Sequence, residues 1–314
     1  MKILIEIPTW LGDAVMTTPA IENIVLLYPD VDLVIFGAYV STRLFVNHPN
    51  VSQIIVDESK KQGFRYWNLY KYAKSFGTVD KAFSFRKNFT TKFLLYFIDS
   101  KEKYMYQRYT KEIIHQVLRY NDFINHSLAI DSTPDRLKIY IDHKDKKNRL
   151  LLGINPGATY GSAKRWYPEE FAKVAIALAE KYEIIIFGGP GETDIAADIE
   201  TVLKEANITQ YQNLAGKTSV EELITTIATL DLFITNDSGP MHVAAAFNIP
   251  TVSIFGPTKH LETHQWMNHH EMLLRKEMDC APCMKRVCPL KHHECMKLLK
   301  AEDVLKRLKS ENIG

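Results

Sequence analysis

Cysteine is scarce in this chain, which has only four among 314 residues, all within the segment 280–295. A small secreted fold held together by disulfides carries many more cysteines for its length, so that class is excluded. Glycine and proline, at 14 and 13 residues, are too few for a collagen-like or low-complexity chain. What remains, with 46% hydrophobic residues, is a globular protein whose length predicts two domains of about 100 to 200 residues each.

Long hydrophobic runs are absent as well. Glu6 and Pro8 interrupt the apolar stretch at the N-terminus, which therefore does not form the core of a signal peptide. The uncharged run 238–258 contains three prolines, which argues against a membrane-spanning helix. We therefore expect a cytoplasmic protein without a transmembrane helix.

Two familiar nucleotide-binding motifs are incomplete. Gly216, Lys217 and Thr218 resemble the end of a P-loop, but Tyr211 stands where that loop requires its first glycine. The dinucleotide fingerprint G-x-G-x-x-G is missing after the first apolar run, and residues 188–191 do not match it. ATPase and nicotinamide-dependent chemistry are therefore disfavoured.

Short apolar runs alternate with helical patterns along the chain. In the first half we expect strands at 2–8, 32–36, 52–56 and 81–85, and helices at 12–28, 41–47, 66–76 and 90–98. In the second half we expect strands at 150–155, 183–187, 232–235 and 251–255, and helices at 168–182, 193–206, 220–230, 239–247 and 301–309. A polar run at 142–149 separates the halves and predicts domains 1–149 and 150–314. This alternation predicts an α/β fold with parallel sheets covered by helices on both faces.

Charge is unevenly distributed, although the formal net charge is only +2. Residues 1–150 carry 22 basic and 16 acidic residues, whereas 151–314 carry 17 and 21. The excess is concentrated in 60–111, which holds 13 basic residues, three acidic residues and 15 of the 34 aromatic residues. This stretch is either a solvated basic face over an aromatic core or a docking surface for an anionic, partly apolar partner.

Two turns after expected strands are suited to phosphate without a P-loop. Residues 236–242 (Asn-Asp-Ser-Gly-Pro-Met-His) follow a strand and begin a helix, whose free amide groups attract anions. An ordinary N-cap at Asp237 or Ser238 is the alternative. The other turn, 156–168, is glycine-rich and ends in Lys164 and Arg165, two cations suited to neutralising phosphate.

Taken in order, four motifs resemble glycosyltransferase family 9. They are IPTWLGDAVM at 7–16, NPGA to KRW at 155–166, NDSGPMH at 236–242 and CAPC at 280–283. The resemblance implies the GT-B architecture, with two Rossmann-like, doubly wound parallel-sheet domains facing a central cleft. The N-terminal domain would bind the acceptor and the C-terminal domain the nucleotide sugar. The family pattern does not extend to the basic aromatic stretch 60–111.

The resemblance also implies an activity. The expected enzyme is a heptosyltransferase that uses ADP-L-glycero-D-manno-heptose as donor and heptosyl-Kdo-lipid A, in the inner core of lipopolysaccharide, as acceptor. Transfer would invert the anomeric centre without a metal. The protein would lie peripherally on the cytoplasmic face of the inner membrane, with no nucleic-acid partner.

Roles for individual residues follow from the same resemblance. Asp13 corresponds to the catalytic base, for which a plain helix N-cap is the alternative, and Lys164 to the lysine that neutralises the leaving diphosphate. The donor-binding positions implied are Thr159, Lys164, Arg165, Glu192, Thr218, Asp237, Ser238, Gly239 and His242. In the basic stretch we expect acceptor contacts at Arg86, Lys87 and Lys92.

The spacing Cys280-x2-Cys283-x4-Cys288-x6-Cys295 offers the ligands of a structural zinc or iron-sulfur site. It is a weaker signal than two matched Cys-x2-Cys pairs, and the family resemblance accounts for these cysteines without a metal. We therefore expect reduced or locally paired cysteines and no cofactor, with a structural metal as the alternative.

Other functions stay open on the sequence alone. They are transfer to a different inner-core acceptor, another nucleotide-sugar reaction on the same scaffold such as a 2-epimerase, and a non-catalytic two-lobed binding protein. The absence of a signal peptide disfavours a periplasmic binding protein.

Overall fold

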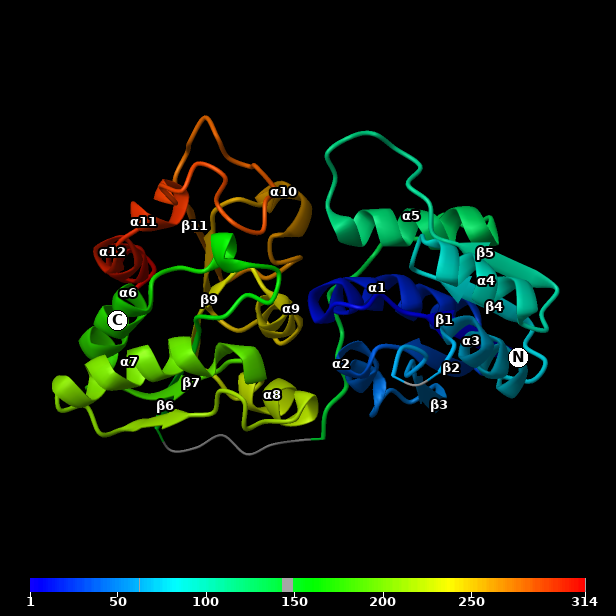
Figure 1. Cartoon of the computed structure of the whole chain (residues 1–314), viewed down its shortest axis with the longest axis horizontal. Helices are drawn as coiled ribbons and strands as arrows, with labels where there is room; N and C mark the ends of the chain where they lie inside the picture. Colours follow the sequence, from blue (N-terminus) through cyan, green and yellow to red (C-terminus); the bar gives the residue numbers. More distant parts are fainter. Residues whose placement is uncertain (62, 143–148, 314) are drawn as a thin grey trace. The chain divides into compact units, whose positions relative to one another are not determined.

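The computed structural model describes residues 1–61, 63–142 and 149–313. The chain divides into two compact units, Met1–Asp142 and His143–Gly314. Each unit is built around one parallel sheet with helices packed against it (Figure 1). The domain boundary expected between residues 149 and 150 stays a prediction, because most of the polar run 142–149 lies outside the described residues.

The first unit holds a five-stranded sheet in the order β3-β2-β1-β4-β5. Its strands are β1 (Lys2–Glu6), β2 (Asp32–Gly37), β3 (Val51–Val56), β4 (Lys81–Ser84) and β5 (Glu102–Met105). Its helices are α1 (Leu11–Leu27), α2 (Tyr39–Thr42), the 3-10 turn η1 (Arg43–Phe45), α3 (Arg65–Ser75), α4 (Phe89–Phe97) and α5 (Gln116–Leu128). The strand order reverses between β1 and β4, so the carboxyl ends of these neighbours form the switch point where such sheets bind ligands.

Both faces of this sheet are buried, because successive side chains of a strand point to opposite faces. Leu4, Val34 and Ala82 form one core with residues of α3 and α4. From the other face, the ring of Phe83 lies 6.3 Å from the ring of Phe123 in α5. Helix α1 lies beside α5 (Figure 1). The pair α1 and α5 therefore covers the face opposite α3 and α4.

The second unit holds a six-stranded sheet in the order β11-β10-β9-β6-β7-β8. Its strands are β6 (Leu150–Asn155), β7 (Tyr182–Ile186), β8 (Tyr211–Asn213), β9 (Leu232–Asn236), β10 (Thr251–Phe255) and β11 (Glu271–Arg275). Its helices are η2 (Ser162–Lys164), α6 (Pro168–Leu178), η3 (Pro190–Glu192), α7 (Thr193–Glu205), α8 (Val220–Ile227), α9 (Gly239–Ala246), α10 (His260–Thr263), α11 (Glu294–Lys297) and α12 (Ala301–Ser310). Its switch point lies between β6 and β9.

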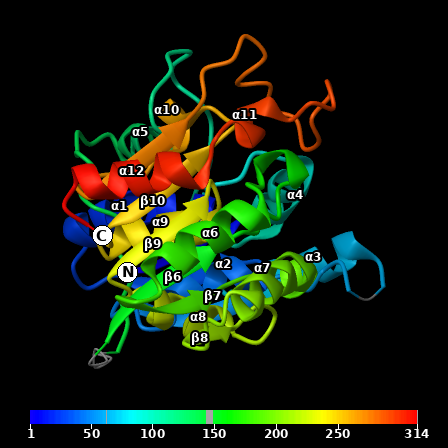
Figure 2. The same cartoon turned by 90° about the vertical axis from the view of Figure 1, so that its left-hand side faces the viewer.

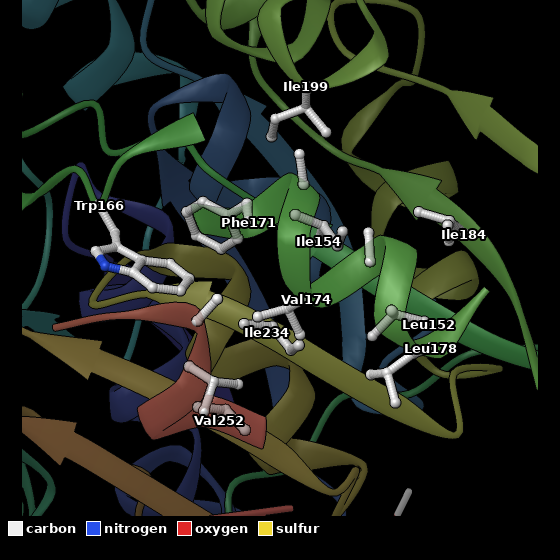
Figure 3. Close-up of a cluster of buried hydrophobic side chains, with 14 of the residues drawn as sticks. Leu152, Ile154, Trp166, Phe171, Val174, Leu178, Ile184, Ile199, Ile234 and Val252 are labelled. Carbon is white, nitrogen blue, oxygen red and sulfur yellow. The ribbon is translucent and has the colours of Figure 1, made fainter. Parts of the chain in front are cut away.

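The core of the second unit anchors the loop that precedes α6. Figure 3 shows Trp166 beside Phe171, and their ring centres are 4.8 Å apart with the planes at 70°. The indole Nε1 of Trp166 donates to the Leu299 carbonyl over 2.9 Å. Helix α12 follows Leu299 and packs beside α6 (Figure 2). Removing this ring would cost about 3 to 5 kcal/mol of stability, so the loop before α6 is firmly positioned.

All eight expected strands are confirmed to within two residues. The helix expected at 41–47 lies two residues earlier and is not a continuous α-helix, since the chain forms the short α2 and then the 3-10 turn η1. The helix expected at 168–182 is too long, because α6 ends at Leu178 and Tyr182 already begins β7. The strands β5, β8 and β11 and the helix α5 were missed. Each of these strands is at a sheet edge and contains exposed or half-exposed residues, so it lacks a continuous apolar run.

Among the described residues no helix is long and apolar enough to cross a membrane.

Candidate functional site

Most of the predicted donor-binding residues follow β6 or β9, whose carboxyl ends form the switch point of the six-stranded sheet, while Glu192 follows β7 and Thr218 follows β8. The last residue of β9 is the buried Asn236. Its Nδ2 donates to the Pro156 carbonyl over 2.7 Å, and its Oδ1 accepts from the Trp166 amide over 3.0 Å. These bonds tie both ends of the intervening loop to β9. Lys164, near the end of that loop, is therefore held by the sheet.

Lys164 and Asp237 form a largely buried ion pair at this switch point. Lys164 Nζ lies 2.7 Å from Asp237 Oδ2. The same oxygen accepts a hydrogen bond from the Thr258 hydroxyl over 2.6 Å. The side chains of Lys164 and Asp237 are 12% and 6% exposed, so water screens their attraction only weakly. The lysine expected to neutralise the diphosphate and an aspartate expected among the donor-binding residues thus lie in contact.

Arg165 and Glu192 form a second, looser pair beside the first. Arg165 Nη2 lies 3.8 Å from Glu192 Oε1, and Glu192 Oε2 accepts from the Gly189 amide over 2.9 Å. The carboxylate occupies the space next to Gly157, where an added methyl carbon would lie only 2.1 Å from Glu192 Oε2. The absence of a side chain at Gly157 therefore lets Glu192 reach the end of β6.

The loops that carry Glu192 and Thr218 are connected. The Gly216 amide donates to the Gly188 carbonyl over 2.9 Å, which joins the loop after β8 to the loop after β7. Thr218 is half-buried in the loop after β8. Thr159 is exposed in the loop after β6. All of these loops leave the same edge of the sheet, since parallel strands end together.

Ser238 stands at the N-cap position of α9, but its side chain makes no capping bond. Its hydroxyl instead accepts from Asn155 Nδ2 over 3.0 Å. Gly239 is the first residue of α9, and the buried His242 is the fourth. Ser238 is therefore the N-cap residue by position, as the alternative expected, but its side chain does not cap the helix. The amide groups of the first turn, which attract anions, are not used by that hydroxyl.

In the first unit, Asp13 is the third residue of α1, and Trp10 occupies the N-cap position. The N-cap alternative for Asp13 is therefore wrong. The carboxylate of Asp13 lies close enough to Tyr120, in α5, for its charge to act on the tyrosine hydroxyl. Burial and then the charge of Asp13 raise the pKa of Tyr120 well above its ordinary value of 10.0. Tyr120 therefore remains protonated at neutral pH, and its hydroxyl is available to donate to the Asp13 carboxylate.

Arg86, one of the three expected acceptor contacts, is the partner of a buried carboxylate. Arg86 Nη1 lies 3.1 Å from Glu6 Oε1, while Glu6 Oε2 accepts from Ser84 and Thr91 over 2.6 and 2.9 Å. Burial raises the pKa of Glu6 above 4.5, although these three partners each act to lower it. Lys87 and Lys92 are exposed. An acceptor role for the three cations stays a prediction.

The cysteine-rich tail packs against the loop of Lys164. The Ala163 amide donates to the Arg286 carbonyl over 3.0 Å, and the Ala163 carbonyl lies 2.9 Å from His293 Nε2. The four cysteines are free thiols and line one small cavity together with His292 and His293. Burial, and then the other three cysteines, raise the pKa of Cys295 to about 11. Within the described part of the chain, which includes the whole tail, no group of three His, Cys, Asp or Glu side chains is placed to hold a metal ion.

Sequence reasoning missed two residues of these sites, Thr258 and Tyr120. Thr258 follows β10, the neighbour of β9, and its place just past a strand was a usable signal. Tyr120 lies in a helix that was not expected at all. The spacing of buried Val117, Tyr120, Phe123 and Ile124 was the signal for that helix, because it places them on one helical face.

Two Rossmann-like units, each built on one parallel sheet with its own switch point, are the GT-B architecture that is found in sugar-transferring enzymes. The sequence model of glycosyltransferase family 9 (heptosyltransferase) matches residues 101–294. The chain is also 42% identical over 316 residues to "Lipooligosaccharide heptosyltransferase 2" of Campylobacter jejuni subsp. jejuni serotype O:6. The aligned region covers 98% of this chain and 98% of that protein. The chain therefore belongs to glycosyltransferase family 9.

Solved structures support the fold. The Escherichia coli ADP-heptose lps heptosyltransferase II matches with a TM-score of 0.80 and 22% identity, over 99% of this chain and 98% of that one. The E. coli heptosyltransferase WaaC with ADP also matches with a TM-score of 0.80, at 15% identity and 99% coverage of both chains. Family membership makes the chain a glycosyltransferase of lipopolysaccharide core biosynthesis, and the epimerase and binding-protein alternatives are set aside.

Proposed function

We propose that this enzyme transfers L-glycero-D-manno-heptose from ADP-heptose to heptosyl-Kdo-lipid A, with inversion at the anomeric carbon. The observation that carries the proposal is the Lys164–Asp237 pair at the switch point of the second unit. Similarity of the whole chain supports the choice of sugar, since a relative named heptosyltransferase 2 is 42% identical over 98% of the chain.

The donor diphosphate takes the place beside Lys164, Arg165 and the first turn of α9. The ammonium and the guanidinium neutralise the phosphate oxygens, and the helix amides donate to them. As the bond from the anomeric carbon to the phosphate oxygen breaks, its electron pair stays on ADP. Lys164 stabilises that growing charge. Asp237, once the ammonium turns to phosphate, becomes an acceptor for the sugar hydroxyls.

The adenosine end of the donor lies along the connected loops of Glu192 and Thr218. The Glu192 carboxylate is suited to accept from ribose hydroxyls, because the Gly189 amide already fixes its orientation. Thr159 and Ser238 supply hydroxyl groups to the phosphates from either side of the switch point.

Asp13 acts as the base. An acceptor hydroxyl attacks the anomeric carbon on the face opposite ADP, and Asp13 takes its proton, so the products are ADP and the glycoside of inverted configuration. Tyr120 is the residue that positions Asp13, through the hydroxyl that donates to the carboxylate.

The reaction is independent of metal, because Lys164 and Arg165 already supply positive charge to the leaving diphosphate. The acceptor is a membrane glycolipid, which places the enzyme peripherally on the cytoplasmic face of the inner membrane. Lys87 and Lys92 attract its phosphate groups from the basic stretch of the first unit.

The test is an acceptor panel. Purified enzyme is incubated with ADP-heptose and Kdo-lipid A, heptosyl-Kdo-lipid A or a longer core, and the product linkage is determined by NMR. Addition of one heptose to heptosyl-Kdo-lipid A with inverted configuration supports the proposal. Preference for a different acceptor would replace it with transfer at another inner-core position, and retention of configuration would rule out the single displacement.

A further inference from the structure

We propose that an aromatic groove between α3 and α4 is a membrane-docking surface, which inserts between the acyl chains of an anionic phospholipid bilayer. This inference rests on the proposed function, because it names the surface through which the enzyme would reach a membrane glycolipid. The groove lies wholly within the first unit, on the face of its sheet opposite α1 and α5, the helices that carry Asp13 and Tyr120.

The groove has a volume of about 530 Å³ and is lined only by aromatic side chains. Four come from α3 and the residue before it, and three from α4: Phe64, Tyr66, Trp67 and Tyr70, and Phe89, Phe93 and Phe97. Since Phe89, Phe93 and Phe97 recur every four residues, they form one stripe along α4.

The rings of the two helices meet edge to face, which holds the groove in shape. The Tyr66 ring centre lies 5.0 Å from that of Phe93, and the Tyr70 ring centre lies 5.1 Å from that of Phe97. Beneath them, Leu69 and Leu94 belong to the buried core. The aromatic rings are therefore displayed on a rigid base.

The outer rings of the groove are strongly exposed. Phe64 is 71% exposed, Phe89 69% and Trp67 56%, and Tyr96, on the same helix as Phe89, is 76% exposed. Isolated apolar side chains on a surface are ordinary, but a contiguous aromatic patch marks an interaction site. Trp and Tyr are also the side chains that favour the boundary between lipid headgroups and acyl chains.

Charge identifies the partner. Helices α3 and α4 carry four basic residues, Arg65, Lys71, Lys74 and Lys92, and no acidic residue. Lys71 Nζ lies 5.7 Å from the centre of the Trp67 ring, and Lys74 Nζ lies 5.6 Å from that of Tyr70. An apolar groove bordered by ammonium groups fits an anionic lipid surface, where the rings enter the acyl region and the lysines meet headgroup phosphates. A neutral apolar partner would leave this charge without a counterpart.

Vesicle binding tests the inference. The full chain is sedimented with vesicles of phosphatidylethanolamine and phosphatidylglycerol, or of phosphatidylcholine alone, at low and high salt. We expect binding to the anionic vesicles that salt weakens. The double variant Trp67→Ser/Phe89→Ser should show a partition coefficient about tenfold or more below that of the wild type. The double variant Lys71→Gln/Lys74→Gln should lower the partition coefficient about fivefold for each charge removed.

A matched control is the double variant Leu26→Ser/Tyr39→Ser, which removes two exposed apolar side chains of the same unit outside the groove. It should bind vesicles like the wild type. Equal loss in this control, or retained binding by the Trp67/Phe89 variant with an unchanged melting temperature, overturns the inference. Equal binding to phosphatidylcholine overturns it too.

Insertion of the aromatic groove into the acyl region of the bilayer can be measured separately from binding. Lipids brominated on their acyl chains should quench the fluorescence of the wild type, and Trp67→Phe should lose most of that quenching while still binding the vesicles. Unquenched bound protein would mean that the groove does not enter the acyl region.

Transfer to a deacylated, soluble acceptor separates this inference from the proposed function. All groove variants should turn it over at the wild-type rate. If the wild type does not use the acceptor at all, the proposed function fails while the vesicle result stands. If the groove variants alone lose turnover of the soluble acceptor, the groove binds the acceptor sugar and the docking proposal is wrong.

Discussion

The ammonium of Lys164 lies 2.7 Å from the Asp237 carboxylate, and both side chains are nearly buried. Removing one partner of such a pair leaves the other charge buried and uncompensated, at a cost of about 3 kcal/mol in the free energy of unfolding. We therefore predict that Lys164→Met lowers stability by about that amount. It should also lower kcat by about 10² to 10³, since the leaving diphosphate loses its cation.

The double variant Lys164→Met/Asp237→Asn separates these two effects. It removes both charges, so chemical denaturation should show most of the stability recovered. Its kcat should stay as low as that of Lys164→Met. Recovery of turnover together with stability would mean that Lys164 serves folding alone.

Asp13 and Tyr120 support a prediction about the base. Asp13→Asn keeps the size of the side chain but accepts a proton far less readily, so kcat should fall by about 10² to 10⁴. ADP binding, measured by calorimetry, should stay within about twofold, because the proposed function assigns ADP to the second unit. Near-normal turnover in Asp13→Asn would remove Asp13 as the base.

Tyr120→Phe is the companion variant, because it deletes only the hydroxyl to which the proposed mechanism assigns the positioning of Asp13. A positioning role predicts a drop of about tenfold in kcat with little change in the KM for ADP-heptose. A purely structural role would instead lower the melting temperature and leave the turnover of the folded fraction unchanged.

The strands could be predicted from the sequence because the central ones are buried on both faces and appear as continuous apolar runs, as in β6 and β9. The candidate donor loops could be predicted because they directly follow β6 and β9, two of these strands. Contacts between segments that are far apart in the sequence could not be predicted. Nothing near Asp13 in the sequence signals Tyr120, and Thr258 reaches Asp237 only because β10 pairs with β9. Local patterns thus located the loops, while packing determined their partners.

Gly157 supports a prediction with an internal control. A methyl group at Gly157 would lie 2.1 Å from Glu192 Oε2, whereas one at Gly191 would meet nothing within 4 Å. Gly157→Ala must displace the Glu192 carboxylate, so we expect ADP affinity to fall about tenfold and stability by about 1 to 3 kcal/mol. Calorimetric titration with ADP should show Gly191→Ala indistinguishable from wild type. Equal behaviour of the two variants would mean that Glu192 does not help to bind ADP.

The cysteine tail supports a prediction about metal. The described residues hold no group of three suitable side chains placed for a metal ion, and the raised pKa of Cys295 keeps its thiol protonated at neutral pH. Elemental analysis of purified enzyme should give far less than one zinc or iron per chain, and EDTA should leave the transfer rate unchanged. A stoichiometric metal that EDTA removes together with activity would contradict both the free-thiol tail and the metal-independent mechanism.

Glu6 supports a prediction about pH, because burial raises its pKa above 4.5 in the folded state. A carboxyl group whose pKa is higher folded than unfolded contributes stability that is fully present below about 4.5 and is lost as the pH rises through the folded-state pKa. Glu6→Gln cannot ionise, so its melting temperature relative to wild type should rise between pH 4 and pH 7.

Glu22 provides the opposite case. Burial would raise its pKa, but hydrogen bonds with His48 and Lys138 outweigh burial and lower the pKa below 4.5. Glu22→Gln should therefore become less stable than wild type over the same interval. Parallel trends in the two variants would mean that Arg86, not burial, dominates the environment of Glu6.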